Sequence, residues 1–422
     1  MGSTPQAGRR RALALVGVAE LFAMTLWFSA SAVAPELSAT WGMTPTEEGL
    51  LTTAVQLGFV AGALASAALT LADVVRPKVL FAASAFAGAA ATAAIALAVD
   101  SPEPAIALRF ATGVALAGVY PTGMKMLAGW FREGRGLAIG VLVGALTVGS
   151  ATPHLLRALG GLGAGGGGGA DGAATAGVGD PGLVLLGAAG LATVAGVLVL
   201  FFEDGPHVSP SSAFDPRAVV RIARDRGVVL ADLGYFGHMW ELYAVWTWLP
   251  VYLAASYASR GVDAAGALGS LLAFGAIAIG GVGAWTFGAA ADRVGRTTVT
   301  SVSMVGSGLA CLLAGVAFGA PTVLIAPFVL LWGFLIVADS AQFSAAVSEL
   351  ADDEYVGSAL TLQTAVGFLL TVASIQLTPV VADAVGWRWA FAPLAVGPAV
   401  GTLAMVALAR SDDARELAGG RG

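Results

Sequence analysis

Long apolar runs separated by short polar stretches dominate the chain. Six runs precede residue 203 and six follow residue 227. A helix needs roughly 20 residues to cross the hydrocarbon core of a bilayer. Because hydrocarbon offers no partners for backbone amides, such runs must be helical. The pattern therefore predicts twelve spanning helices, at 12–34, 49–72, 78–98, 105–128, 136–158, 182–202, 228–254, 265–290, 298–318, 322–347, 357–381 and 388–409.

The composition narrows the class of protein further. Of the 422 residues, 57% are hydrophobic and only 11% are charged, and the mean hydropathy is +0.82. A soluble domain carries roughly 25% charged residues, so one water-soluble core is excluded. Cys311 is the only cysteine, which leaves no disulfide framework and no thiolate cluster for a metal. We expect no cofactor and no nucleic-acid partner.

The polar stretch 203–227 divides the chain into two parts. We predict an N-terminal six-helix bundle at 1–202, a cytoplasmic linker at 203–227, a C-terminal six-helix bundle at 228–409 and a cytoplasmic tail at 410–422. The linker holds four arginines and predicts a short amphipathic helix. The first run, from Ala12 to Ala34, is longer than the core of a signal peptide, so we expect an uncleaved first span.

The distribution of basic residues predicts the orientation. Lys and Arg are retained on the cytoplasmic side of a membrane. With the N-terminus inside, 17 of the 21 Lys and Arg residues fall at or near the inner face, and the reverse orientation inverts that ratio. We therefore expect a multi-pass protein of an inner or plasma membrane with both termini cytoplasmic.

Several residues recur at a fixed offset in the two parts of the chain. Asp73 and Asp292 are 219 residues apart, and Trp27 and Trp246 are separated by the same number. A six-helix unit written twice is a common construction of secondary transporters, which bind their solute between the repeats. The expected fold is all-α, with two six-helix pseudo-repeats around a central cavity.

A charged loop between two runs carries the most specific motif. It reads Gly-x-x-x-Asp-Arg-x-Gly-Arg from Gly288 to Arg296, and it resembles the signature of the major facilitator superfamily. Its counterpart around Asp73 and Arg76 is degenerate. Arg109-x-x-x-Gly113-x-x-x-x-Gly118 resembles a second motif of that family. The resemblance covers nearly the whole chain and implies transport by alternating access.

The two loops predict a gating motif at the cytoplasmic face. Gly295 suits a tight turn, and arginines hold a short loop at the headgroups. The resemblance implies that Asp292 meets the helix start near Arg135, and that Asp73 meets a helix start near Gly357. A topology anchor without a gating role is the alternative. The predicted gating residues are Asp73, Arg76, Arg135, Gly288, Asp292, Arg293, Gly295 and Arg296.

Charged residues within the runs are candidates for chemistry, because a charge in the membrane is costly and is usually kept for function. The candidates that we place deep in the membrane fall on the first, fourth, seventh and tenth runs, and the resemblance implies that these four line the central cavity. For Asp232 and Lys125 we favour snorkelling to the interface. The predicted substrate and proton cavity contains Glu20, Arg109, Tyr120, His238, Glu241, Asp339 and Gln342.

Glu241 is the leading candidate for the proton carrier, with His238 tuning or sharing its proton. It lies about 14 residues into its span, or roughly 20 Å, near the middle of the membrane. A carboxyl that can exchange a proton near neutral pH is what proton coupling requires. The alternative is a fixed hydrogen bond to a Trp or Tyr.

Other function classes find little support. The pattern His238-x-x-Glu241 resembles part of a metalloprotease motif, but Leu242 follows where that motif needs a second His. The sequence also lacks the Gly-x-Ser-x-Gly elbow of serine hydrolases. We therefore expect no enzyme. A non-transporting sensor is a third class, but it could drop the charged loops and the buried charges, most of which this chain keeps.

The solute stays open between two alternatives. The chain distantly resembles nitrate/nitrite porters but lacks their substrate arginines and their Asn-bearing signatures. Arg109, Lys125 and His238 suit uptake of a small organic anion with protons, which we slightly favour. Glu20, Glu241 and Asp339 suit export of a cationic or amphipathic compound against protons. We expect a monomer whose partners are a small solute, protons and the lipid bilayer.

Overall fold

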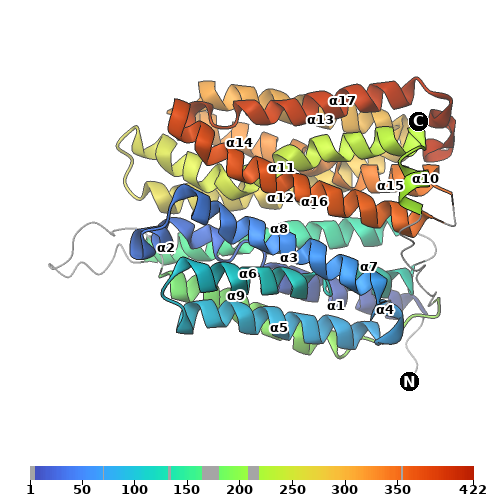
Figure 1. Ribbon diagram of the computed structural model, residues 1–422, viewed down its shortest axis with the longest axis horizontal. Coiled ribbons are helices and arrows are strands. Elements are labelled where there is room, and N and C mark those ends of the chain that lie inside the picture. Colours follow the sequence, from blue (N-terminus) through green and yellow to red (C-terminus); the bar gives the residue numbers. More distant parts are fainter. Residues whose placement is uncertain (1–4, 70, 132–134, 164–179, 208–217, 353–354) are drawn as a thin grey trace.

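The protein is described by a computed structural model covering residues 5–69, 71–131, 135–163, 180–207, 218–352 and 355–422. Within these ranges the chain forms helices and loops without a β-strand, and most of the long helices run roughly along the long axis of the molecule (Figure 1). Nine of the described segments are long and apolar enough to cross a membrane. They are α3 (Pro45–Ala68), α5 (Pro77–Ala98), α6 with α7 (Pro102–Leu116 and Tyr120–Ala128), α9 (Pro181–Val199), α12 (Ala265–Val294), α13 (Arg296–Ala317), α14 with α15 (Thr322–Ala338 and Ser340–Leu350), α16 (Val356–Val385), and α17 (Val396–Ala409) with the turns η3 (Trp387–Trp389) and η4 (Ala392–Ala395) before it.

Three further long helices lie in the same bundle. They are α1 (Pro5–Met24), α8 (Arg135–Gly163) and α11 (Arg226–Ala258). Helix α1 packs against α8 and α9, while α11 packs against α12, α16 and α17. The predicted all-α membrane fold is thus confirmed, and the count of twelve spans depends on including these three. The short elements are η1 (Ser31–Val33), α2 (Ala34–Trp41), α4 (Leu71–Val74), α10 (Ala218–Ile222) and η5 (Asp412–Gly419).

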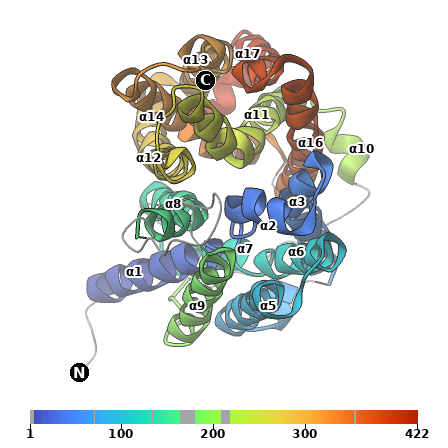
Figure 2. The same ribbon diagram turned by 90° about the vertical axis from the view of Figure 1, so that its left-hand side faces the viewer.

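The helices gather in two groups when viewed along their axes (Figure 2). Helices α1 to α9 form one group, here termed the N half, and α11 to α17 form the other, the C half. The halves meet along two helix pairs, α8 with α12 and α3 with α16. The start of α1, helix α10 and η5 share one end of the bundle, termed the basic end, and α2 lies at the opposite end (Figure 1).

Backbones cross closely inside each half. A Cβ atom on Gly113 would lie 1.9 Å from the carbonyl oxygen of Val55, so α6 and α3 touch there without intervening side chains. In the C half, a Cβ atom on Gly333 would lie 2.0 Å from the carbonyl oxygen of Ala276. Small residues that let helix backbones approach are typical of membrane bundles, where dispersion contacts and hydrogen bonds hold the helices together.

Three of the predicted runs contain a break that hydropathy did not reveal. The first run leaves the α-helix after Met24 and resumes at α2. The fourth run breaks between α6 and α7, and the tenth breaks between α14 and α15. Tyr120 begins α7 and Asp339 precedes α15; these residues are 219 apart, the offset of the sequence repeat. The two breaks are therefore related by the repeat.

Candidate functional site

The break in the C half brings a histidine and a carboxylate together. His238 Nδ1 of α11 lies 3.0 Å from Asp339 Oδ1, within ion-pair range but without the alignment of a hydrogen bond. The other ring nitrogen, Nε2, lies 2.9 Å from the hydroxyl oxygen of Ser340 at the start of α15. Both partners of the pair are almost fully buried. Two of the predicted site residues thus form one polar contact.

Glu241 lies in the C half and faces α13. The hydroxyl of Ser307 donates to its Oε1 at 2.5 Å, and the thiol of Cys311 donates to its Oε2 at 3.3 Å. The side chain has no exposed surface, and it interacts electrostatically with Asp339. Glu241 thus lies within electrostatic range of Asp339, while its hydrogen bonds come from a helix that the sequence did not single out.

Glu20 lies on α1 in the N half. It is fully buried, and neither carboxyl oxygen has a hydrogen-bond partner among the described residues. Its Oε2 lies against the backbone of Gly123 in α7, where a Cβ atom would come within 2.9 Å of it. Tyr120 interacts electrostatically with Glu20 and also with Tyr235 of the C half. Glu20 thus packs against α7 of its own half, and Tyr120 at the start of α7 lies within electrostatic range of the C half.

Arg109 of α6 holds the break in the first run. The Arg109 guanidinium is fully buried, and it donates hydrogen bonds to backbone carbonyls of that break and of α3. Ion pairs to it are absent among the described residues. The acceptors are the carbonyl oxygens of Leu51 (2.9 Å), Leu26 (2.8 Å) and Trp27, and the hydroxyl of Ser29 (3.1 Å). Arg109 is thereby occupied by its own half.

Aromatic rings fill the seam between the halves. Trp27 lies with its ring centroid 5.8 Å from that of Tyr243 and 5.6 Å from that of Phe368. Phe59 lies 5.0 Å from Phe368, and Phe28 lies 6.0 Å from Trp246. The hydroxyl of Thr371 on α16 also donates to the Gln56 side chain on α3. The repeat-related Trp27 and Trp246 therefore both contribute to the contact between halves.

A buried ion pair marks the end of the seam farthest from the basic end. Arg157 of α8 pairs with Glu36 of α2 through two nitrogens. Its third nitrogen donates to the hydroxyl of Ser270 on α12, at 2.7 Å. One arginine thus joins three helices and links the N half to the C half.

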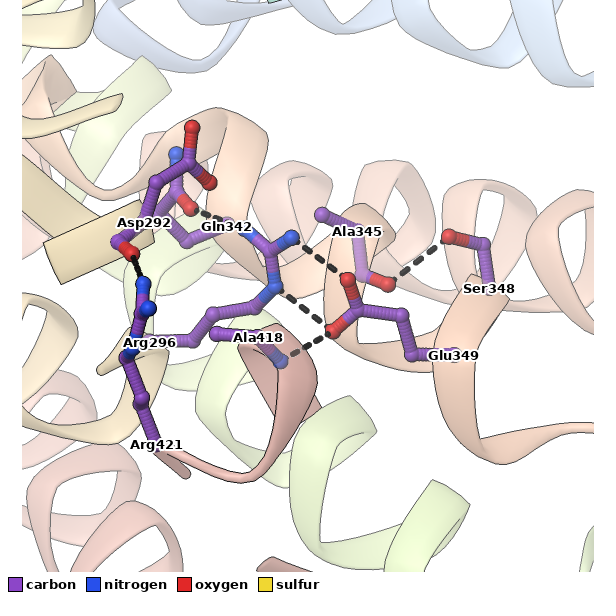
Figure 3. A network of polar contacts seen from close by, with 8 residues as sticks. All are labelled: Asp292, Arg296, Gln342, Ala345, Ser348, Glu349, Ala418 and Arg421. Atoms are coloured by element: carbon purple, nitrogen blue, oxygen red, sulfur yellow. Dashed lines mark hydrogen bonds and ion pairs between the residues drawn. The ribbon is translucent and has the colours of Figure 1, made fainter. Parts of the chain in front are cut away.

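The signature loop lies at the basic end, between α12 and α13 (Figure 3). Arg296 donates to both carboxyl oxygens of Glu349, at 2.7 and 2.5 Å, and to the amide oxygen of Gln342 at 2.7 Å. Asp292 is exposed, and Gly295 has φ +97°, a conformation that favours glycine. The loop is therefore tied to α15 of its own half through Arg296.

The remaining predicted gating residues lie around these contacts or outside the description. Gly288 lies on α12 near Gln342, and Arg293 is exposed. Arg76 is exposed just before α5. The side chains of Asp73 and Arg135 lie outside the described residues, so the expected contacts of Asp73 with the helix start near Gly357 and of Asp292 with that near Arg135 stay predictions.

Sequence reasoning missed several contact residues. Ser307 and Cys311 are uncharged, and nothing in their spacing marks them as partners of Glu241. Glu349 precedes the end of α15 and resembles an ordinary interfacial acid. Gln342, expected in the central cavity, instead bonds Arg296.

Residues 16–287, more than half of the chain, match the family model of the Major Facilitator Superfamily. The chain belongs to the Major Facilitator Superfamily. This superfamily member is accordingly a secondary transporter rather than an enzyme, and it is a multi-pass membrane protein that moves a small molecule. No curated protein matches the chain.

Two solved structures share the fold of this superfamily member. The nucleoside transporter NupG, solved as a mutant, is 14% identical with a TM-score of 0.73, over 94% of this chain and 99% of its own. A bacterial homolog of the human lysosomal transporter Spinster, in an inward-facing and occupied conformation, is 14% identical with a TM-score of 0.70, over 97% of this chain and 98% of its own. At this identity the likeness concerns the fold alone.

Proposed function

We propose that this superfamily member is a proton-coupled antiporter that exports a cationic or amphipathic compound. The observation that carries the proposal is the state of Glu20. Its carboxyl is buried without a hydrogen-bond donor, and no Lys or Arg of the described residues pairs with it. A buried carboxylate without a partner is costly, so the site suits either a proton or a cationic group of the solute.

The contacts of Arg109 weigh against anion uptake, the alternative that the residues alone slightly favoured. That reasoning relied on Arg109, Lys125 and His238 as groups for an anion. Arg109 instead donates hydrogen bonds to three carbonyls and one hydroxyl of its own half. His238 lies beside the carboxyl of Asp339, an acidic group that does not favour an anionic ligand. The acids near the boundary between the halves thus outnumber the basic groups offered to a ligand.

The buried acid group of the C half is the proposed site of the coupling proton. It contains Glu241, Asp339 and His238, held by Ser307 and Ser340. In this scheme a proton on that group and the cation at Glu20 occupy the protein in alternation, as antiport requires. One proton moved through about 100 mV supplies roughly 2.3 kcal/mol, so no ATP site is needed.

The remaining parts of the proposal concern topology. The arginines at the start of α1, in α10 and in the signature loop support a cytoplasmic basic end, hence cytoplasmic termini. We place the protein in an inner or plasma membrane as a monomer. The proposed division is a bundle at 1–202, a linker at 203–227, a second bundle at 228–409 and a tail at 410–422.

The test uses the purified full chain in liposomes at pH 6 inside and pH 8 outside, with the membrane potential clamped by potassium and valinomycin. Tetraphenylphosphonium is the cationic probe, and benzoate and uridine are the anionic and neutral probes. Two pH units permit up to about 100-fold cation accumulation by one-for-one exchange. We expect tetraphenylphosphonium to accumulate above the level in empty liposomes, and Glu20→Gln to lower its initial rate about tenfold or more.

Glu103→Gln is the matched control, because this carboxyl is exposed in the first turn of α6. It should transport the cation at the rate of the unmodified chain. Benzoate accumulation in the reversed pH gradient, with tetraphenylphosphonium excluded, would restore anion uptake as the better proposal. Unchanged cation transport by Glu20→Gln would remove this residue from the site.

A further inference from the structure

The polar segment after α17 is folded against the C half. Its 3-10 turns, η5, run from Asp412 to Gly419, and the Leu417 side chain within them has no exposed surface. η5 packs against α15 and α17 and also touches α12. The backbone of Gly227 at the start of α11 lies against Asp413, where a Cβ atom would be 3.2 Å away. A buried leucine in a charged segment indicates a built contact, since exposed polar tails bury none.

The segment bonds directly to the network of the signature loop (Figure 3). The backbone N–H of Ala418 donates to Glu349 Oε2 at 3.1 Å, the same carboxylate that receives two bonds from Arg296. The Arg421 guanidinium donates to the backbone carbonyl of Asp292. The loop is thus held at two places, through Glu349 and through its own backbone.

The signature glycine leaves room for this contact. A Cβ atom on Gly295 would lie 2.1 Å from the carbonyl oxygen of Arg421 and 2.8 Å from that of Gly422. Both distances are too short for any side chain, and the positive φ of Gly295 independently favours glycine. The turn and the segment therefore fit each other at the level of the backbone.

The hydrogen bonds made by residues 412–422 leave the Asp292 carboxylate of the signature loop accessible. Arg421 bonds the Asp292 backbone, while the Asp292 carboxylate points away from Arg421 and Glu349 (Figure 3) and the residue is exposed. Within the described residues, the segment contacts Glu349, Asp292, Gly295 and Gly227, which all belong to the C half. The segment thus travels with that half.

We propose that residues 412–422 form a positioning element, termed the tail clamp, that holds the signature loop in the shape needed to close the inner gate. The inference rests on the proposed gating role of the loop and is independent of the solute and the coupling ion. A loop held at both places has lost its conformational entropy before it meets the N half, so closure costs less. Loss of the tail clamp therefore depletes the inner-closed state without changing the solute site.

The test measures the gate directly, without any substrate. Spin labels are attached at Val79 on α5 and Val302 on α13, which are exposed positions in opposite halves near the basic end. The background is Cys311→Ser, which removes the native thiol and keeps a hydroxyl beside Glu241. Distributions of the distance between the two labels are recorded by pulsed electron paramagnetic resonance on the full chain in lipid nanodiscs.

Arg421→Ala and Leu417→Ala should each lower the ratio of inner-closed to inner-open molecules about threefold or more. Arg421→Lys should restore much of that ratio, because it keeps a charged donor. Arg415→Ala is the matched control, since the Arg415 side chain is 84% exposed and pairs with Asp412 of the same segment. It should leave the distribution unchanged.

Two results would overturn the tail clamp. One is an unchanged distribution in Arg421→Ala; that exposed residue can be replaced without disturbing the fold even where Leu417→Ala fails to fold. The other is an equal shift in Arg415→Ala, which would assign the effect to charge in the segment as a whole. Neither result depends on tetraphenylphosphonium transport, so failure here and failure of the antiport proposal are distinguishable.

Discussion

Both halves bury a carboxyl on their first long helix, but they surround it differently. Glu20 of the N half has no donor among the described residues, whereas Glu241 of the C half receives the Ser307 hydroxyl and the Cys311 thiol. The repeat offset of 219 places Glu20 opposite Met239, so the two acids are not counterparts. The difference teaches that the repeat preserves the scaffold, while each half has acquired its own chemistry.

The two halves also differ at Arg109, whose counterpart is Phe328. The N half breaks its first helix after Met24, and Arg109 binds the carbonyls exposed by that break. Helix α11 of the C half continues unbroken from Arg226 to Ala258. It has no such break, and the Phe328 ring at the corresponding position lies against Trp332. The buried charge at Arg109 thus has its partners in the backbone and one hydroxyl of its own half.

The largest expected effect follows from removing that charge. Arg109→Ala leaves three buried carbonyls and one hydroxyl without their donor, and each such loss costs about 1–3 kcal/mol. We expect the free energy of unfolding to fall by roughly 3 kcal/mol or more, measured by thermal unfolding in detergent.

Arg260→Ala is the control for Arg109→Ala, because Arg260 is exposed in the loop after α11. It should unfold like the unmodified chain. If Arg109→Ala kept full stability and lost only affinity for benzoate, the arginine would be a ligand group, and anion uptake would regain its main support.

The second effect compares the two acids. Glu241→Gln should abolish accumulation driven by the pH gradient, lowering it about tenfold or more, while exchange of tetraphenylphosphonium across the liposome membrane persists. Glu20→Gln should slow both accumulation and exchange, because it alters the proposed cation site. Ser307→Ala, which removes one donor to Glu241, should shift the pH dependence of accumulation without slowing exchange.

This pair of variants separates the roles of the halves. Accumulation that survives Glu241→Gln would move the coupling proton away from the C half. Identical behaviour of the two Gln variants would mean that one site serves both proton and solute.

The smallest expected effect concerns the signature loop. Asp292→Asn should slow transport about threefold without altering which probe is bound, as read from initial rates and from thermal shifts with each probe. Asp383→Asn, an exposed acid near the end of α16, is the control and should leave the rate unchanged. Altered selectivity among the three probes would remove Asp292 from the gating role.

Much of the fold could be predicted from sequence because it depends on hydropathy and spacing. Apolar runs located the helices, and the offset between Asp73 and Asp292 revealed the repeat. The breaks before Tyr120 and at Asp339 could not be foreseen, since a hydropathy average is the same for a straight and a broken helix. They are nonetheless where the polar side chains meet.

The candidate site was predicted only in part, for a different physical reason. Charges in apolar runs identified Glu20, His238, Glu241 and Asp339, because the membrane makes every charge conspicuous. Their partners escaped notice, since Ser307 and Cys311 are ordinary small residues in a spanning helix. Backbone carbonyls, which bind Arg109, leave no mark in a sequence at all. The burial of Leu417 likewise depends on a surface assembled from distant segments.

The close backbone crossings at Gly113 and Gly333 have a mechanical consequence for transport. Where two main chains touch, no side chain can change rotamer to absorb a displacement, so each half moves as a rigid body. A solute that binds between the halves cannot be accommodated by a local conformational change within either half. Its binding must instead change the angle between the two halves. A small chemical contact thereby moves the whole molecule.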